Sequence, residues 1–173
     1  RVHSGDPSLY GAIGEQIREL RALNIPFEIV PGVTATAACA ALLEAELTLP
    51  EVAQTVILTR YGHNSPMPAG EELGALASHR ATLAIHLGVQ HLPRIIDELL
   101  PYYGADCPIA VVHRASWPDQ DWVRGTLADI EARVAVKGFR RTALILVGRV
   151  LATDDFAQSA LYAEATRHLY RLD

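Results

Sequence analysis

The chain has 173 residues, of which 50% are hydrophobic and 20% are charged, and its formal net charge is −5. This composition is typical of a globular protein and excludes a disordered chain. The negative charge argues against a nucleic-acid partner, because phosphate binding requires a basic surface. No apolar run has the length of a membrane span, so we expect neither nucleic acid nor a membrane among the partners.

The basic residues are nearly all arginines, since Lys137 is the only lysine. Arginine suits fixed, forked recognition of carboxylates better than a diffuse basic patch does. The two cysteines, Cys39 and Cys107, are far apart in the sequence and form no CxxC pair. We expect both to be reduced and buried in a cytoplasmic protein, and a disulfide in a secreted protein is the alternative.

The first fifty residues alternate between strand and helix, which predicts a parallel α/β layer. Apolar residues from Ile13 onward recur at helical spacing until Asn24 and Pro26 stop the helix. The expected elements are a strand end at residues 2–3, a helix from residue 13, a strand at 27–30, and a helix at 35–45 with Thr34 as its N-cap. Because residues 1–3 look like a strand cut open in the middle of a fold, we expect the native protein to continue upstream.

A second series of elements follows residues 47–52, which we interpret as a linker. Strands and helices alternate again, and the continuous apolar strands indicate a sheet that is buried on both faces. The expected strands are 55–59, 82–87, 109–113, 122–124 and 142–150, and the expected helices are 71–77, 92–102, 127–136 and 156–170.

Two Gly/Pro turns, each after a predicted strand, are the strongest candidates for a ligand site. They are Gly5-Asp6-Pro7 and the PGVTA segment at 31–35. Turns at the carboxyl ends of parallel strands face the ligand crevice, and glycine lets a ligand approach the backbone. Asp6 is predicted to accept hydrogen bonds from a ribose or an amino group, or to cap the helix. An ordinary capped turn without a ligand is the alternative for both segments.

The histidines and tryptophans offer weaker signals. The seven histidines include no HExxH or other short paired spacing, so no metal site is predicted. His86 and His113 end predicted strands, where they either line a pocket or belong to the core. Trp117 and Trp122 flank one loop, and they either pack or hold a flat ligand.

Six stretches along the chain, taken together, resemble the tetrapyrrole (corrin/porphyrin) methylases. Their order and spacing agree with that family across nearly the whole chain. Residues 54–73 (QTVILTRYGHNSPMPAGEEL) further resemble the branch that methylates precorrin-4 at C-11. The six stretches are HSGDPSLYG at 3–11, VPGVTATAA at 30–38, LTLPE at 47–51, ATLAIHLG at 81–88, PIAVVHRAS at 108–116 and TALILVGRV at 142–150.

The resemblance implies an α/β fold of two αβα domains, with S-adenosylmethionine bound in the cleft between them. It implies that residues 1–50 are the C-terminal half of the first domain, which is incomplete here, and that residues 51–173 are the second domain. The family opens with a strand and a GxGPGDP-type loop that this chain lacks. Carried over to the matching positions, the cofactor-binding residues are Ser4, Gly5, Asp6, Leu9, Thr34, Ala35, Leu87 and Ala115.

The resemblance also implies methylation of precorrin-4 at C-11 in cobalamin biosynthesis, by a cytoplasmic homodimer. The alternatives are a sister methylase acting on uroporphyrinogen III or another precorrin, and a non-catalytic fragment. An electron-rich ring carbon needs little deprotonation, so we expect no single side chain to be essential as a general base. The predicted substrate-binding residues are Arg60, Tyr61, Met67, Pro68 and Arg114. Arg60, Arg114 and Arg124 are candidates for holding substrate carboxylates, with solvated or ion-paired surface roles as the alternative.

Overall fold

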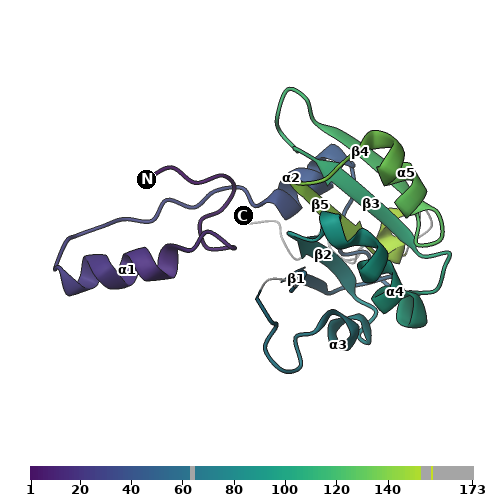
Figure 1. The fold of residues 1–173 in the computed structure, drawn as a ribbon, viewed down its shortest axis with the longest axis horizontal. Coiled ribbons are helices and arrows are strands. Elements are labelled where there is room, and N and C mark those ends of the chain that lie inside the picture. The colour runs from purple at the N-terminus through teal and green to yellow at the C-terminus, as the bar shows by residue number, and fades with distance from the viewer. Residues whose placement is uncertain (63–64, 153–156, 158–173) are drawn as a thin grey trace, which may run out of the picture.

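A computed structural model of the chain describes residues 1–62, 65–152 and 157. A five-stranded sheet with helices on both faces forms the body of the molecule. Residues 1–34, called the arm below, project away from this body (Figure 1). The α/β class expected from the sequence is confirmed. The predicted helix at 156–170 lies outside the described residues.

The sheet is mixed, and its strand order is β1-β2-β5-β3-β4. Strands β1 and β2 are parallel, whereas β5 runs antiparallel to both of its neighbours and β4 runs antiparallel to β3. All five predicted strands of the second series are confirmed to within a few residues. Their bounds are β1 Val56–Arg60, β2 Thr82–His86, β3 Pro108–His113, β4 Asp121–Thr126 and β5 Ala143–Val147.

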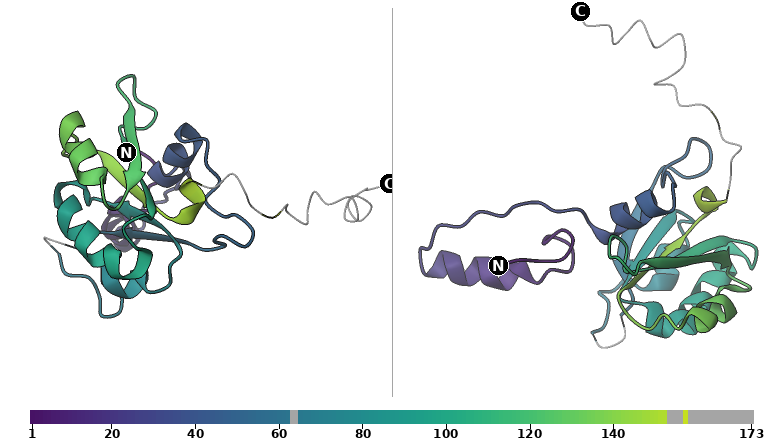
Figure 2. Two further views of the ribbon diagram at one scale, coloured as in Figure 1. Left: turned by 90° about the vertical axis from the view of Figure 1, so that its right-hand side faces the viewer. Right: turned by 90° about the horizontal axis from the view of Figure 1, so that it is seen from above.

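Helices cover both faces of the sheet, as the right-hand view of Figure 2 shows. Successive strand residues point to opposite faces, so Leu83 and Ile85 join one core while Ala84 joins the other. No helix in the described part of the chain is both long and apolar enough to cross a membrane. One face carries α3 (Leu73–Ala77), α4 (Leu92–Tyr103) and α5 (Ile130–Lys137), and the other carries α2 (Ala35–Leu42) and the 3-10 helix η2 (Arg149–Leu151); a second 3-10 helix, η1 (Val89–His91), leads into α4.

Helix α2 packs on the sheet formed by the later residues. Its Cys39 and the following Leu43 are buried against the sheet, where Ala84 and Ala110 are small enough to let the helix approach closely. Leu49 is buried in the same core and forms an isolated bridge with Ala53. The domain boundary at residue 50 stays a prediction, but residues 35–50 are packed on the body.

The arm differs from what the sequence predicts. It consists of α1 (Ile13–Ala22), none of whose residues is buried, and an extended segment that returns toward the body. Helix α1 and its stop at Asn24, where φ is 52°, are confirmed. The strands predicted at 2–3 and 27–30 are wrong, because an extended segment becomes a strand only when a neighbour accepts its hydrogen bonds, and none of the described segments pairs with them.

Candidate functional site

A cleft of about 880 Å³ lies along one edge of the sheet. The parallel and antiparallel pairings bring the ends of β1, β2 and β3 and the start of β5 to this same edge. The base of the arm and the first residues of α2 close the cleft from the other side. The volume and the mixture of polar and apolar walls are typical of a small-molecule site.

The two Gly/Pro turns meet at the base of the arm. The Asp6 carboxylate accepts a hydrogen bond from the Gly32 N–H at 2.9 Å and another from the Ser8 N–H at 2.8 Å, besides one from the Ser8 hydroxyl. The Ser8 hydroxyl is the largest cause that holds the pKa of Asp6 below its usual value, and the two backbone N–H groups add to it. Asp6 therefore joins the turns, a role beyond the ligand and capping roles considered from the sequence.

Glycine is required where these turns cross. A Cβ on Gly32 would lie 2.2 Å from the carbonyl oxygen of Gly5, which real Cβ atoms do not approach. Gly5 itself has a φ of +70°, a conformation that side chains other than glycine rarely adopt. The two turns thus form one rigid unit at the mouth of the cleft.

The first turn of α2 opens into the cleft. The Thr34 hydroxyl accepts a hydrogen bond from the Thr36 N–H at 3.4 Å, which confirms the predicted N-cap. Within the same first turn, Thr36 Oγ1 and His86 Nε2 share a hydrogen bond of 3.1 Å, which ties α2 to the end of β2. The Tyr10 ring lies 5.0 Å from the imidazole of His86. Burial lowers the pKa of His86, so this histidine is neutral at physiological pH.

Apolar side chains lie uncovered inside the cleft. Leu87 follows β2 and is 69% exposed, and Val33 in the second turn is 67% exposed. Leu87 has a φ of 56° and Ser116, beyond β3, has a φ of 70°. Positive φ values of this kind cost energy and cluster at ligand sites. The uncovered apolar surface indicates a ligand with an apolar part.

The loop after β3 places an arginine at the cleft. The Arg114 guanidinium lies 5.2 Å from the ring centroid of Trp117 and pairs with Asp119. Its Nε is buried and has no hydrogen-bond partner among the described residues. Trp117 lines the cleft, whereas Trp122 lies on β4 outside the lining. Of the two roles considered for the tryptophans, facing a ligand is open to Trp117 alone.

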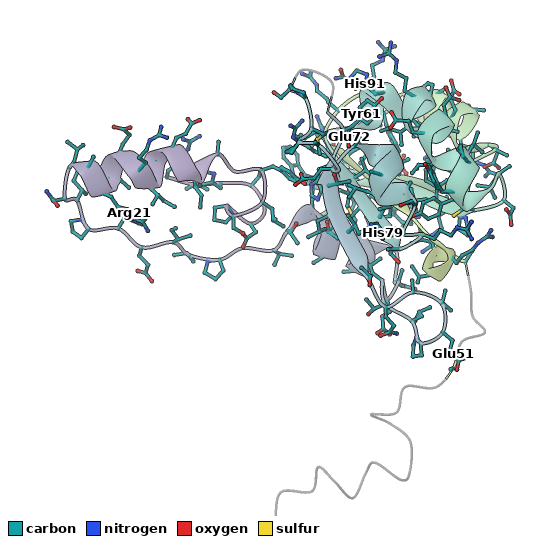
Figure 3. The ribbon with its side chains drawn as sticks, turned by 90° about the horizontal axis from the view of Figure 1, so that it is seen from below. Arg21, Glu51, Tyr61, Glu72, His79 and His91 are labelled. Carbon is teal, nitrogen blue, oxygen red and sulfur yellow. The ribbon has the colours of Figure 1, made fainter. Side chains whose placement is uncertain are left out.

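The end of β1 supplies the opposite wall. Tyr61 donates a hydrogen bond to Glu98 at 3.0 Å, and its ring lies 5.4 Å from that of His91, beside which Figure 3 shows it. Burial, followed by the Glu98 hydrogen bond, raises the pKa of Tyr61. Arg60 donates to the carbonyl oxygens of Ser65 and Pro66 at 3.1 and 3.3 Å, which holds the following loop against the cleft.

The structure brings together most of the residues predicted from the sequence. Met67 and Pro68 are not part of the cleft lining. Arg124 is also elsewhere, because it donates to the carbonyl oxygens of Leu43 and Leu151, so a role in holding substrate carboxylates finds no support. The predicted residues that line the cleft are Ser4, Gly5, Asp6, Leu9, Thr34, Ala35, Leu87 and Ala115 for the cofactor, and Arg60, Tyr61 and Arg114 for the substrate.

Several lining residues were not predicted. Tyr10 and His91 come from segments that the sequence marks only as a turn and a break. Arg140, Arg141 and Thr142 come from the loop between α5 and β5. The adjacent arginines just before the most strand-like run were the signal that would have drawn attention to this loop. Within the described residues, no group of three or more His, Cys, Asp or Glu side chains is arranged to hold a metal ion.

The fold and the cleft define an α/β protein with a small-molecule site at one edge of a mixed sheet. Residues 1–131 match the family profile of the Tetrapyrrole (Corrin/Porphyrin) Methylases. The chain is 74% identical over 171 residues to the precorrin-4 C(11)-methyltransferase of Pseudomonas aeruginosa, covering 99% of this chain and 68% of that protein. It is 50% identical to the cobalt-precorrin-4 C(11)-methyltransferase of Methanocaldococcus jannaschii, covering 99% of this chain and 66% of that protein. The chain belongs to the tetrapyrrole methylase family.

Solved structures agree with this assignment. The X-ray structure of a cobalt-precorrin-4 methyltransferase superposes with a TM-score of 0.86 at 43% identity, over 88% of this chain and 64% of that one. A uroporphyrin-III C-methyltransferase from Thermus thermophilus, complexed with S-adenosylhomocysteine, gives a TM-score of 0.68 at 29% identity, over 85% and 64% of the two chains. The chain therefore spans about two thirds of the length of these relatives.

Proposed function

We propose that this chain makes up about two thirds of an S-adenosylmethionine-dependent methyltransferase that methylates precorrin-4 at C-11 in cobalamin biosynthesis. The observation that carries the proposal is the 74% identity to the P. aeruginosa enzyme of that name over 99% of the chain. The main alternative, a sister methylase acting on uroporphyrinogen III, is less favoured because the uroporphyrin-III methyltransferase structures are only 29–31% identical to this chain.

The cleft fits S-adenosylmethionine in its chemistry. The cofactor is amphipathic, and the cleft offers uncovered apolar side chains at Val33 and Leu87 beside the polar turns. All the residues predicted for the cofactor lie in this one lining, although they come from four separate segments of the sequence. We infer that the turns at Gly5 and Thr34 hold the cofactor largely through their backbone, and that Leu87 and Ala115 pack against its apolar part.

The side chains of the cleft are suited to alignment rather than to proton transfer. When bound, S-adenosylmethionine supplies an electrophilic methyl group on a positively charged sulfur. With the ligands bound, Leu87 and Val33 would exclude water from the reacting atoms, and the two joined turns would hold the donor in one orientation toward the acceptor carbon. Burial lowers the pKa of His86, which makes its imidazole a weaker base, and raises the pKa of Tyr10 and of Tyr61, which makes their hydroxyls weaker acids. This agrees with the expectation that no single side chain is an essential base.

Two further features belong to the same proposal. We propose that the enzyme is a homodimer, on the resemblance to the family alone, and that it is cytoplasmic. The cysteines support a reducing compartment, because Cys39 and Cys107 are both free and buried. Sedimentation equilibrium of the purified protein tests the dimer.

The test of the function has two steps. Calorimetry with S-adenosylhomocysteine is expected to give a micromolar Kd, about −8 kcal/mol, for the wild-type protein. Leu87→Arg, which places a charge in the cleft, is expected to lower this affinity at least tenfold. Val136→Arg is the matched control, because Val136 is exposed on α5 and is not in the cleft lining. Incubation with precorrin-4 and isotopically methyl-labelled cofactor then shows by NMR which ring carbon receives the methyl group.

The outcomes separate the alternatives. Label at C-11 supports the proposal, and label at another carbon identifies a sister methylase. Binding of both ligands without any transfer indicates a non-catalytic fragment. Absence of S-adenosylhomocysteine binding contradicts the methyltransferase function. A single-residue variant that binds both ligands but transfers no methyl group contradicts the expectation that no base is essential.

A further inference from the structure

The charge of the cleft is opposite to that of the chain. The formal net charge of the chain is −5, yet among the described lining residues Asp6 is the only acidic one, and its oxygens already accept hydrogen bonds within the joined turns. Arg60, Arg114, Arg140 and Arg141 all line the cleft. Positive charge attracts anionic groups, so the part of the cleft lined by these arginines favours the anionic groups of a ligand.

The loop that carries Arg140 and Arg141 is held at both ends. Gly138 ends α5 in the left-handed conformation, and the buried Phe139 stacks on His113 with ring centroids 4.9 Å apart and an interplanar angle of 11°. On the other side, the carbonyl oxygen of Thr142 accepts the Arg114 N–H at 2.9 Å. The backbone that carries the two arginines is therefore held in place, and both residues line the cleft, as Arg114 does.

Arg140 and Arg141 differ from the other arginines around the cleft. Arg114 pairs with Asp119, and Arg60 donates to two carbonyl oxygens. The side chains of Arg140 and Arg141 are exposed and make no hydrogen bond or ion pair with any described residue. Two guanidinium groups that line the cleft from consecutive residues and have no partner among the described residues are available to carboxylates, which arginine binds through two parallel hydrogen bonds.

We propose that Arg140 and Arg141 bind carboxylate side chains of the tetrapyrrole substrate and set the preference for a heavily carboxylated ring. The inference rests on the proposed function and adds to it a recognition element outside the six stretches that resemble the family. The cofactor also carries a carboxylate, so the same chemistry has two sources. Measuring both ligands separately tells them apart.

The test compares three forms of the full-length gene product. They are the wild type, the double variant Arg140→Gln/Arg141→Gln, and the control Arg80→Gln/Arg94→Gln, which removes the same charge from exposed positions outside this cleft. Fluorescence titration gives the Kd of uroporphyrin III and of coproporphyrin III, which has fewer carboxylates. Calorimetry gives the Kd of S-adenosylhomocysteine.

We expect the double variant to bind uroporphyrin about a hundredfold more weakly than the wild type, because each arginine that is replaced removes a charge-assisted hydrogen bond and costs about tenfold in affinity. Its preference for uroporphyrin over coproporphyrin is expected to shrink, while its affinity for S-adenosylhomocysteine stays within twofold. The control is expected to match the wild type in all three titrations. In a fourth protein, replacement by lysine at both positions is expected to restore part of the affinity, because the charge returns without the forked geometry.

Three results overturn the inference, and they differ from one another. Unchanged porphyrin affinity in the double variant removes the two arginines from the site and leaves the proposed function intact. A loss of S-adenosylhomocysteine affinity instead assigns them to the cofactor. A wild-type protein that binds S-adenosylhomocysteine but no porphyrin contradicts the proposed substrate class and this inference with it.

Discussion

At the scale of single residues, the site depends on how closely two backbone turns approach each other. In the first turn, the Asp6 carboxylate accepts a hydrogen bond from the Gly32 N–H of the second turn. Gly32 has no side chain, which leaves room for the carbonyl oxygen of Gly5. Neither residue needs to touch a ligand for the cleft to depend on it. A change at either position alters the shape of the cleft through the backbone.

Gly32→Ala tests this dependence. The added methyl group would lie 2.2 Å from a backbone oxygen, so the turns must separate. We expect at least a tenfold loss of S-adenosylhomocysteine affinity by calorimetry. The far-ultraviolet circular dichroism spectrum is expected to stay unchanged, because α1 has no buried residue whose packing the separated turns could disturb. Gly14→Ala is the control, since its Cβ meets nothing within 4 Å. Equal affinities for Gly32→Ala and the wild type would show that the crossing is not needed for binding.

At the scale of elements, the ends of helices decide where the cleft residues lie. Helix α2 begins at the cleft because Thr34 caps it there, and the Thr36–His86 hydrogen bond fixes its rotation over the sheet. Helix α5 ends at Gly138, whose φ of +69° turns the chain toward the loop that carries Arg140 and Arg141. A left-handed residue at this position is the usual way for a helix to stop before a strand.

Gly138→Ala is expected to destabilise the protein by about 1 kcal/mol, because alanine is strained at positive φ. No atom lies within 4 Å of the added Cβ, so the cost is purely conformational. Gly74→Ala makes the same chemical change inside α3, also in open space, and there we expect a small gain in stability. Urea denaturation of both variants checks the opposite signs. Stabilisation by both would mean that residue 138 does not hold a left-handed conformation in solution.

At the scale of the whole molecule, one sheet separates two cores. The core under α3, α4 and α5 contains Cys107, and the core under α2 contains Cys39. The two thiols are therefore natural reporters of the two faces. Cys39 is 2% exposed and Cys107 is 0% exposed.

We expect neither cysteine to react with iodoacetamide at pH 8 in the native protein. Burial raises the pKa of Cys39 to about 12 and that of Cys107 to about 11, so the reactive thiolate is scarce as well as inaccessible. In rising urea, Cys39 is expected to react first, since among the described helices α2 and η2 cover its face, whereas three helices cover the other. Peptide mapping by mass spectrometry measures each site. Rapid labelling of Cys107 in native buffer would contradict this packing.

The local elements were predictable because their signals are local. Apolar residues at helical spacing predict α4, and continuous apolar runs predict β2, β3 and β5. Glycine and proline predict the two turns of the site. The strands expected in the arm failed for a different reason, since a strand depends on a neighbour that a sequence pattern does not supply.

The sequence by itself determined the α/β class, the order of the strands from β1 to β5, the family and the two turns that line the cleft. It did so because periodicity, capping residues and Gly/Pro turns act over a few neighbouring residues. Only the tertiary structure decided that Thr36 meets His86 and that Asp6 reaches Gly32. It also left Arg124 outside the cleft and brought Arg140 and Arg141 into it. Those contacts join residues far apart in the chain, and they follow from strand pairing and helix packing, which no local pattern encodes.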